Sequence, residues 1–307
     1  MDIYRTDNFP FPLPEGHRFP LGKYRMLARQ LVGDGIVSEK EMRVPRETTT
    51  EELSRVHTRE YIQRFEHGEM TAKEMRRIGL PWSVELVKRT RRSVGATVES
   101  CFAALEDGSA VSLSGGTHHA FPDRGEGYCV YNDGAVAARA MQAAGLAERI
   151  LVLDTDVHQG NGTAFTFRED PTVFTFSIHG KNNFPFHKQA GNLDVDLEDG
   201  TDDEAYLEAL RKGLDTIRRR FTADMAIYLA GADPYLDDLY GRIALSKEGL
   251  ARRDQDVLGF CREHRLPVAV TMAGGYARNI ADSVDNHVQT VRIFRDADLD
   301  SEPKKAR

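Results

Sequence analysis

The sequence predicts an α/β protein in which a mostly parallel β-sheet is flanked by helices. Short apolar, β-branched segments alternate along the chain with longer segments of helical periodicity. The apolar segments also end in polar residues or glycine, as strands do where a sheet carries a ligand site. The 307 residues contain no internal repeat, so we expect a single domain over 1–307 with its core between roughly 15 and 295.

The individual elements follow from composition and spacing. Buried parallel strands are predicted where short runs are apolar and β-branched, at 110–116, 149–156, 172–180, 224–233 and 267–276. Helices are predicted where apolar residues recur at helical spacing, at 84–105, 133–144, 201–220 and 250–264. The stretch "TDDE" predicts that Thr201 caps the third of these helices, with Glu204 as its capping-box partner. The segment 300–307 is expected to fray.

Charge and composition exclude several classes of function. The net charge is −7 and no basic stripe is present, so we expect no direct binding to nucleic acid. Arg89, Arg91 and Arg92 are interpreted as the solvated face of a helix. No apolar run approaches the about 20 residues that a membrane-spanning helix needs. Three scattered cysteines and an N-terminus without an apolar signal core predict a cytoplasmic protein.

The ends of the predicted strands contain the residues with chemical potential. In chain order the ends read "SGGTHH", "DTDVHQG", "FSIHG", "AGAD" and "AGGY". Ligands bind at the carboxyl ends of the strands in open parallel sheets. We therefore expect these five ends to converge on one site.

The second strand end has the pattern of a metal site. Asp154, Asp156 and His158 alternate, so their side chains share a face if the strand continues. Aspartate and histidine are ligands of catalytic zinc, and Asp233 is the best candidate for a third ligand. An isolated Asp-x-Asp can instead cap the following helix, and this alternative stays open.

Other strand ends predict groups that transfer protons or stabilise charge. His118 and His119 are either proton-transfer groups beside a metal or ordinary polar residues of a loop. Tyr276 follows two glycines and could donate a hydrogen bond to an oxyanion or simply pack at the rim of the sheet. Tyr128, Phe184 and neighbouring loop residues are candidates for the walls of a pocket.

In their order and spacing, "SGGTHHAFPDRGEGYCVYND", "LDTDVHQGNG", "FSIHG", "AGAD" and "AGGY" resemble the metal-dependent histone deacetylase family. The resemblance extends over residues 22–281. "DRGEGYC", "HQGNG" and the compact length are most similar to the class IV branch and its bacterial relatives. The resemblance implies the arginase–deacetylase fold, with a central mostly parallel sheet of about eight strands.

The resemblance also implies roles for individual residues. Zinc, with iron(II) as the alternative, is expected on Asp156, His158 and Asp233. A structural potassium ion is expected on Asp154, Asp156, His158, Ser177 and Ile178. The expected catalytic residues are His118, His119 and Tyr276, with Asp154 supporting His118 and Asn161 supporting His119. Many members have aspartate where this chain has Asn161. The substrate tunnel is expected to be lined by Gly127, Tyr128, Phe184, Phe186, Gly274 and Gly275.

The reaction that these residues imply is hydrolysis of an N-acyl-lysine by metal-activated water, with long-chain acyl groups included among the possible substrates. The expected partner is an acylated protein or peptide, or a small acylated amine. Alternatives are an acetylpolyamine amidohydrolase, a ureohydrolase with two manganese ions and a non-catalytic acyl-lysine binding module. The acyl length and the oligomeric state stay open.

Overall fold

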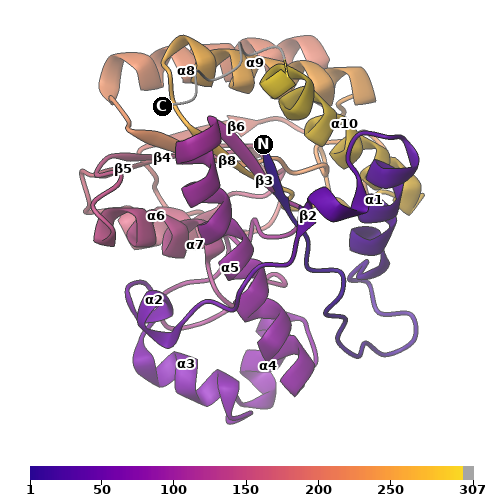
Figure 1. The fold of residues 1–307 in the computed structure, drawn as a ribbon, viewed down its shortest axis with the longest axis vertical. Coiled ribbons are helices and arrows are strands. Elements are labelled where there is room, and N and C mark those ends of the chain that lie inside the picture. The colour runs from indigo at the N-terminus through magenta and orange to yellow at the C-terminus, as the bar shows by residue number, and fades with distance from the viewer. Residues whose placement is uncertain (300–307) are drawn as a thin grey trace.

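A computed structural model describes residues 1–299 of the chain. Its centre is an eight-stranded parallel sheet in the order β2-β1-β3-β8-β7-β4-β5-β6 (Figure 1). The strands are β1 (Asp2–Tyr4), β2 (Met42–Arg43), β3 (Ser109–Ser112), β4 (Ile150–Asp154), β5 (Val173–Gly180), β6 (Leu193–Leu197), β7 (Met225–Leu229) and β8 (Val268–Thr271). The predicted fold class is confirmed.

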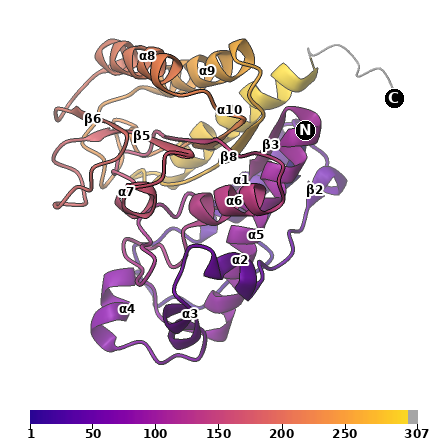
Figure 2. The ribbon, with the colours of Figure 1, turned by 90° about the vertical axis from the view of Figure 1, so that its left-hand side faces the viewer.

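Helices cover both faces of this sheet (Figures 1 and 2). α1, α8, α9 and α10 pack together on one face, whereas α5, α6 and α7 lie on the other, with α2, α3 and α4 beyond them. The helices are α1 (Gly22–Gly33), α2 (Thr50–Ser54), α3 (Arg59–Glu66), α4 (Ala72–Ile78), α5 (Val84–Asp107), α6 (Asp133–Ala143), α7 (Asn161–Phe167), α8 (Asp203–Arg220), α9 (Lys247–Glu263) and α10 (Ile280–Leu299).

Each central strand contributes to two apolar cores. In β4, Leu151 and Leu153 belong to the core under α8–α10, and Ile150 and Val152 belong to the core under α5 and α6. A strand that is buried on both faces has to be apolar at nearly every position. This explains why the five central strands were predicted correctly from short apolar runs.

The strands that were not predicted are short or lie at the edge. β1 and β2 have three and two residues, too few for any periodicity to be visible. β6 reads "LDVDL" and is the edge strand beyond β5. The four predicted helices all exist, and α9 begins three residues before the predicted start.

The start of α8 differs from the prediction by one residue. Asp202 is the N-cap, and its carboxylate accepts a hydrogen bond from the backbone N–H of Ala205 at 3.0 Å. Thr201 instead donates its hydroxyl to the carbonyl of Glu198 at 2.7 Å. The predicted capping box of Thr201 and Glu204 is therefore wrong, because an aspartate one residue later accepts the same kind of bond.

The arginines of α5 do not form a solvated face, and that prediction is also wrong. Arg89 is buried, and its guanidinium carbon lies 4.6 Å from the ring centroid of Tyr24. Arg91 is half-buried and pairs with Glu66 at 2.6 Å. Neighbouring segments thus cover this side of the helix.

Across residues 1–299, every helix is too short or too polar to cross a membrane. The segment 300–307, for which fraying was predicted, lies outside the described residues.

Candidate active site

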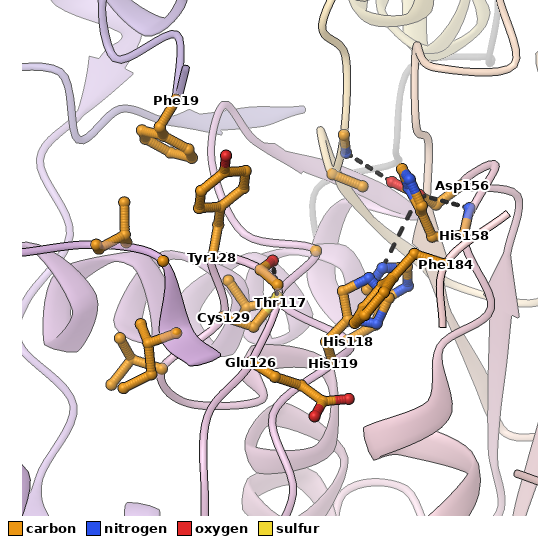
Figure 3. A pocket seen from close by; sticks show the side chains of 18 of the residues that line it. Phe19, Thr117, His118, His119, Glu126, Tyr128, Cys129, Asp156, His158 and Phe184 are labelled. Carbon is orange, nitrogen blue, oxygen red and sulfur yellow. Dashed lines mark hydrogen bonds and ion pairs between the residues drawn. The ribbon is translucent and has the colours of Figure 1, made fainter. Parts of the chain in front are cut away.

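Loops that follow the carboxyl ends of β3, β4, β5 and β8 line one cavity of about 750 Å³, and Asp233, which follows β7, lies beside His158 of that cavity. The loop after β3 contributes His118 and His119, and the loop after β4 contributes Asp156 and His158. Tyr276 reaches the same cavity from the loop after β8. Figure 3 shows the three histidines grouped beside Asp156 at one end of this cavity.

The predicted metal ligands lie together. Asp156, His158 and Asp233 each offer one ligand atom, and these atoms lie within 4.8 Å of one another. His158 Nδ1 is 2.9 Å from Asp156 Oδ1 and 3.3 Å from Asp233 Oδ2. Asp233 Oδ2 is buried and finds no hydrogen bond of good geometry among the described residues. This set of two carboxylates and one imidazole fits a divalent cation, and a bound cation would satisfy the buried Asp233 oxygen.

The outer oxygens of the two carboxylates are held by backbone groups. Val157 N–H donates to Asp233 Oδ1 at 2.9 Å, and Gly274 N–H donates to Asp156 Oδ2 at 2.7 Å. Hydrogen bonds of this kind orient metal ligands. A side chain at Gly274 would place its Cβ 1.8 Å from Asp233 Oδ2, so glycine is required there.

The same three side chains compete for protons. Burial, together with the charge of Asp156, raises the pKa of Asp233 to about 7. Burial lowers the pKa of His158, but its hydrogen bond to Asp156 and the charges of Asp233 and Asp156 outweigh this effect and raise the pKa to about 10. A divalent cation would displace these protons and compensate the two buried carboxylates.

The two adjacent histidines have different partners. His118 Nδ1 lies 2.6 Å from Asp154 Oδ2, and His119 Nδ1 lies 2.7 Å from Asn161 Oδ1. Burial lowers the pKa of His118, but Asp154 and Asp156 outweigh it and raise the pKa to about 9. Burial and the charge of His118 lower the pKa of His119 well below 6.5. The two adjacent imidazoles therefore differ in their affinity for a proton, and burial favours the neutral form of His119.

Glu126 is a site residue that sequence reasoning missed. The side-chain N–H of Asn161 donates to Glu126 Oε1 at 2.6 Å, so Glu126 extends the pair of His119 and Asn161 by one residue. Glu126 stands next to Gly127 in a stretch that was predicted only as a pocket wall. Its 35-residue separation from Asn161 leaves no local signal of this contact.

The loop that contains Tyr276 is held from two sides, by residues that were also missed. The backbone N–H of Tyr276 donates to Asp238 Oδ2 at 2.6 Å. Lys23 is buried, and its Nζ donates to the carbonyls of Ala273 and Gly275, both at 3.3 Å. Burial lowers the pKa of Lys23 to about 8. Nothing in the local sequence around Lys23 or Asp238 indicated these contacts.

Gly127, Tyr128 and Phe184, which are predicted to line a substrate tunnel, are lining residues of the cavity. A Cβ at Gly127 would lie 2.6 Å from the ring of His119 and 3.2 Å from that of Phe184, so these rings come close only because residue 127 is glycine. The Phe184 ring packs edge-on against His119, with centroids 4.9 Å apart. Tyr128 lies against Phe19 at 5.2 Å, well apart from Phe184 (Figure 3).

The other predicted tunnel residues have different positions. Phe186 lines the cavity and is 84% exposed, which places it at the mouth. Gly274 lines the cavity, whereas Gly275 is not among the described lining residues. A Cβ at Gly275 would meet Ala232 and His287, so this glycine supports the loop from behind.

The residues predicted for a potassium site lie at the ends of two paired strands and in the loop after β4. Asp154 and Ser177 are direct partners across β4 and β5, and Ile178 follows in β5. Asp154 Oδ1 accepts a hydrogen bond from Asp156 N–H at 3.1 Å. Ser177 Oγ lies 2.9 Å from His179 Nδ1.

The cavity differs in character between its interior and its mouth. Away from the histidines it is lined largely by apolar side chains, namely Phe11, Phe19, Ile78, Leu80, Leu86, Val94 and Val130. The exposed charged residues that line it are Arg18, Arg77 and Arg242. Arg242 pairs with Asp199 at 3.1 Å, whereas Arg18 and Arg77 form no ion pair with the described residues, so these two arginines leave positive charge at the mouth.

Comparison with protein families and curated proteins gives related sequences. The histone deacetylase domain matches residues 17–291. An uncharacterized protein of Picosynechococcus is 44% identical over 294 residues, which cover 96% of this chain and 98% of that protein. Histone deacetylase 2 of Arabidopsis thaliana is 29% identical, with 88% of this chain and 73% of that protein covered. The acetoin utilization protein AcuC of Bacillus subtilis is 34% identical over 63% of this chain and 56% of its own length.

Solved structures share the fold. A structure titled as an HDAC homolog complexed with SAHA superimposes with a TM-score of 0.83 at 24% identity, covering 99% of this chain and 85% of that one. An HDAC homolog from Aquifex aeolicus has a TM-score of 0.80 at 24% identity, with 94% and 82% covered. At this identity the likeness concerns the fold alone.

Proposed function

The chain belongs to the histone deacetylase family, and from this premise we propose that it is a zinc-dependent hydrolase that removes acyl groups from N-acyl-lysine side chains. The strongest support for this proposal is the arrangement at one end of the cavity. There the histidine pair, His118 and His119, lies beside Asp156, His158 and Asp233. A binding module without turnover has no use for two adjacent histidines whose pKa values are shifted in opposite directions.

The chemistry divides between the metal and the chain. When bound by Asp156, His158 and Asp233, a divalent cation supplies Lewis-acid polarisation of the acyl carbonyl and makes water more acidic. His119 Nε2 takes a proton from the attacking water, because its Nδ1 is occupied by Asn161, and then delivers a proton to the amine leaving group.

Two further residues stabilise charge during the reaction. His118, kept cationic by Asp154, lies next to His119 with ring centroids 4.1 Å apart and opposes the negative charge that develops. Tyr276 donates its hydroxyl to the oxyanion of the tetrahedral intermediate. We also propose that Asp154, Ser177 and the 156, 158 and 178 positions hold the potassium ion that the resemblance implies.

The cavity supports an acylated peptide more than an acetylpolyamine. An acylated polyamine retains other ammonium groups, which the arginines at the mouth would repel. The apolar interior has more volume than an acetyl group needs, which supports the inclusion of longer acyl chains. The acetylpolyamine amidohydrolase remains the second candidate, because it needs the same catalytic residues.

Three broader assignments complete the proposal. The assignment of one catalytic domain to the chain is supported by the two apolar cores of the described residues 1–299, which pack on the same sheet. The chain is placed beside the class IV branch on the stretches "DRGEGYC" and "HQGNG". A cytoplasmic location is supported by Cys101, Cys129 and Cys261, which are all free and buried.

The test is a substrate panel. Zinc-loaded protein is incubated with lysine peptides acylated from acetyl to myristoyl and, in parallel, with acetylpolyamines. Turnover of the peptides that disappears on chelation and returns with zinc is the expected result, and the chain-length profile then defines the acyl preference. Turnover of polyamines alone would move the enzyme to the second candidate. No turnover by fully metal-loaded protein would contradict the proposal.

A further inference from the structure

We propose that Glu126 is a positioning residue that fixes the proton-accepting tautomer of His119 through Asn161. This inference rests on the proposed function, because it gives a specific reason why His119 can act as a base. It concerns a glutamate that touches neither the metal ligands nor His118 through any hydrogen bond of the described residues.

The three side chains form one line of short hydrogen bonds. His119 Nδ1 lies 2.7 Å from Asn161 Oδ1, and Asn161 Nδ2 donates to Glu126 Oε1 at 2.6 Å. Asn161 is 2% exposed, so water does not compete for its amide. In Figure 3 the carboxylate of Glu126 lies beside the two adjacent histidines.

The chemistry of the three groups allows only one arrangement. A carboxylate accepts hydrogen bonds and cannot donate them, so it must face the NH2 group of Asn161. The carbonyl oxygen of the same amide then faces His119, whose Nδ1 must carry the proton to bond with it. A neutral imidazole has one protonated nitrogen, so Nε2 keeps its lone pair. This is the nitrogen that must accept a proton from water.

Without Glu126 the amide has no preferred orientation. An asparagine can rotate by half a turn and present either its oxygen or its NH2 group to a neighbour. If the NH2 group faced His119, Nδ1 would become the acceptor and Nε2 would carry the proton. In that tautomer His119 cannot take a proton from water. Glu126 therefore positions His119 as a base by excluding the tautomer in which Nε2 carries the proton.

The loop around Glu126 is built to hold it in place. Its carbonyl accepts a hydrogen bond from Cys129 N–H at 2.9 Å, and Gly127 N–H donates to the carbonyl of Arg77 at 3.1 Å. A Cβ at Gly125 would lie only 2.4 Å from the carbonyl oxygen of Cys129, so the turn is tight. Asn161 is fixed as the first residue of α7. Both ends of the contact thus belong to constrained backbone.

The arrangement also explains why an amide is suitable at 161 in this chain. Asn161 Nδ2 now donates to Glu126 Oε1 at 2.6 Å. An aspartate at position 161 would replace this donor with a carboxylate oxygen and bring two carboxylates into contact. Two carboxylates at that distance cannot both remain ionised. Asn161 accepts from His119 on one side and donates to Glu126 on the other, so both neighbours are satisfied.

The first experiment reads the tautomer without any turnover. Long-range proton–nitrogen NMR spectra of histidine-labelled, zinc-loaded protein separate the two neutral tautomers, and His119→Phe assigns the signal. We expect the Nδ1–H form in the wild type and a mixture of forms in Glu126→Ala. An unchanged Nδ1–H form in Glu126→Ala would overturn the inference, whether or not the protein is an acyl-lysine hydrolase.

The second experiment is a double-variant series measured by kcat and KM. Glu126→Ala and Asn161→Asp are each expected to lower kcat by about 10-fold or more, a part of the roughly 10²–10⁴-fold that general-base catalysis contributes, with KM, zinc content and thermal midpoint unchanged. Glu126→Gln combined with Asn161→Asp should recover much of the loss, because the introduced amide can donate to the introduced carboxylate.

The controls separate positioning from folding. Exposed Glu60→Gln, remote on α3, should leave kcat unchanged. A combined variant no more active than Asn161→Asp alone would contradict the inference, as would a kcat of Glu126→Ala within twofold of the wild type. Loss of turnover in every protein, including the wild type, would instead count against the proposed function, and the tautomer measurement would still decide the role of Glu126.

Discussion

Asp154 and Asp156 are two residues apart, yet their carboxylates have different partners. Asp154 Oδ2 lies 2.6 Å from His118 Nδ1, whereas Asp156 Oδ1 lies 2.9 Å from His158 Nδ1. β4 ends at Asp154, so the chain beyond it no longer follows the strand and the two side chains reach different groups. These contacts link the carboxylate of Asp154 to the pair of His118 and His119, and that of Asp156 to the candidate metal ligands His158 and Asp233.

The hydroxyl of Tyr276 gives a prediction at this scale. Tyr276→Phe should lower kcat by about 100-fold or more, the cost of removing one oxyanion donor, while zinc content and the thermal midpoint stay unchanged. Tyr240→Phe is the matched control, because the Tyr240 ring lies 5.1 Å from that of Tyr276 and lines the same cavity. Equal kcat values for Tyr276→Phe and the wild type would contradict the role given to this phenol.

Asp233 gives a second prediction at the same scale. Asp233→Asn retains the shape of the side chain but removes one of two anionic ligands, so zinc affinity should fall by more than about 100-fold, the upper cost of changing an outer partner. Competition with a chromophoric chelator measures the affinity. Asp123→Asn, at an exposed carboxylate that pairs with Arg124, should bind zinc like the wild type. Unaltered affinity in Asp233→Asn would exclude it as a ligand.

At the scale of elements, close backbone approaches decide how the long helix α5 sits. A Cβ at Gly95 would lie 2.0 Å from the carbonyl oxygen of Arg46, so the segment before α2 crosses the helix at this point. Thr48 N–H also donates to the carbonyl of Arg91 at 3.1 Å. The segment that leads into α2 is thus held against α5 by backbone contacts that a side chain at Gly95 would break.

This contact predicts opposite effects for two glycine substitutions. Gly95→Ala should destabilise the protein by about 1–3 kcal/mol, the usual cost of overpacking, although alanine is the better helix former. Gly259→Ala in α9 should stabilise it by about 0.5–1 kcal/mol, because nothing lies within 4 Å of the new Cβ. Urea unfolding measures both free energies. Equal shifts in the same direction would show that the crossing at Arg46 does not constrain α5.

At the scale of the whole molecule, charge is distributed unevenly. The chain has a net charge of −7, yet the exposed charged residues around the cavity are Arg18, Arg77 and Arg242. Net charge alone favours cationic substrates, whereas the local field at the mouth favours anionic ones. The local charges decide recognition, because exposed charges beyond about 10 Å are screened at 0.1 M salt.

The field at the mouth predicts a substrate preference. Acyl-lysine peptides with acidic flanking residues should have a higher kcat/KM than peptides with basic flanks, mainly through KM. Raising the salt from 0.1 to 1 M shortens the screening length from about 10 to about 3 Å and should reduce this difference. Arg18→Ser with Arg77→Ser should reduce it as well, whereas Arg219→Ser on α8 should not. A preference for basic flanks would contradict this account of the mouth.

The sequence by itself determined the central strands, the fold class and most of the residues that make up the candidate site. These depend on local patterns, because a doubly buried strand must be apolar over several consecutive residues and a strand end follows immediately. Asp156 and His158 were visible from such a pattern. β1 and β2 were not, since two or three residues contain no periodicity, and the pairing of β2 with β1 and of β1 with β3 depends on the assembled sheet.

Only the tertiary structure decided which residues support the predicted ones. Glu126 is 35 residues from Asn161, and Lys23 is 250 residues from the carbonyl of Ala273 to which it donates. The burial of Arg89 and the grouping of arginines at the mouth were also decided by packing. A hydrogen bond between distant segments leaves no periodic trace in either segment, because each residue type is compatible with many partners until the fold selects one.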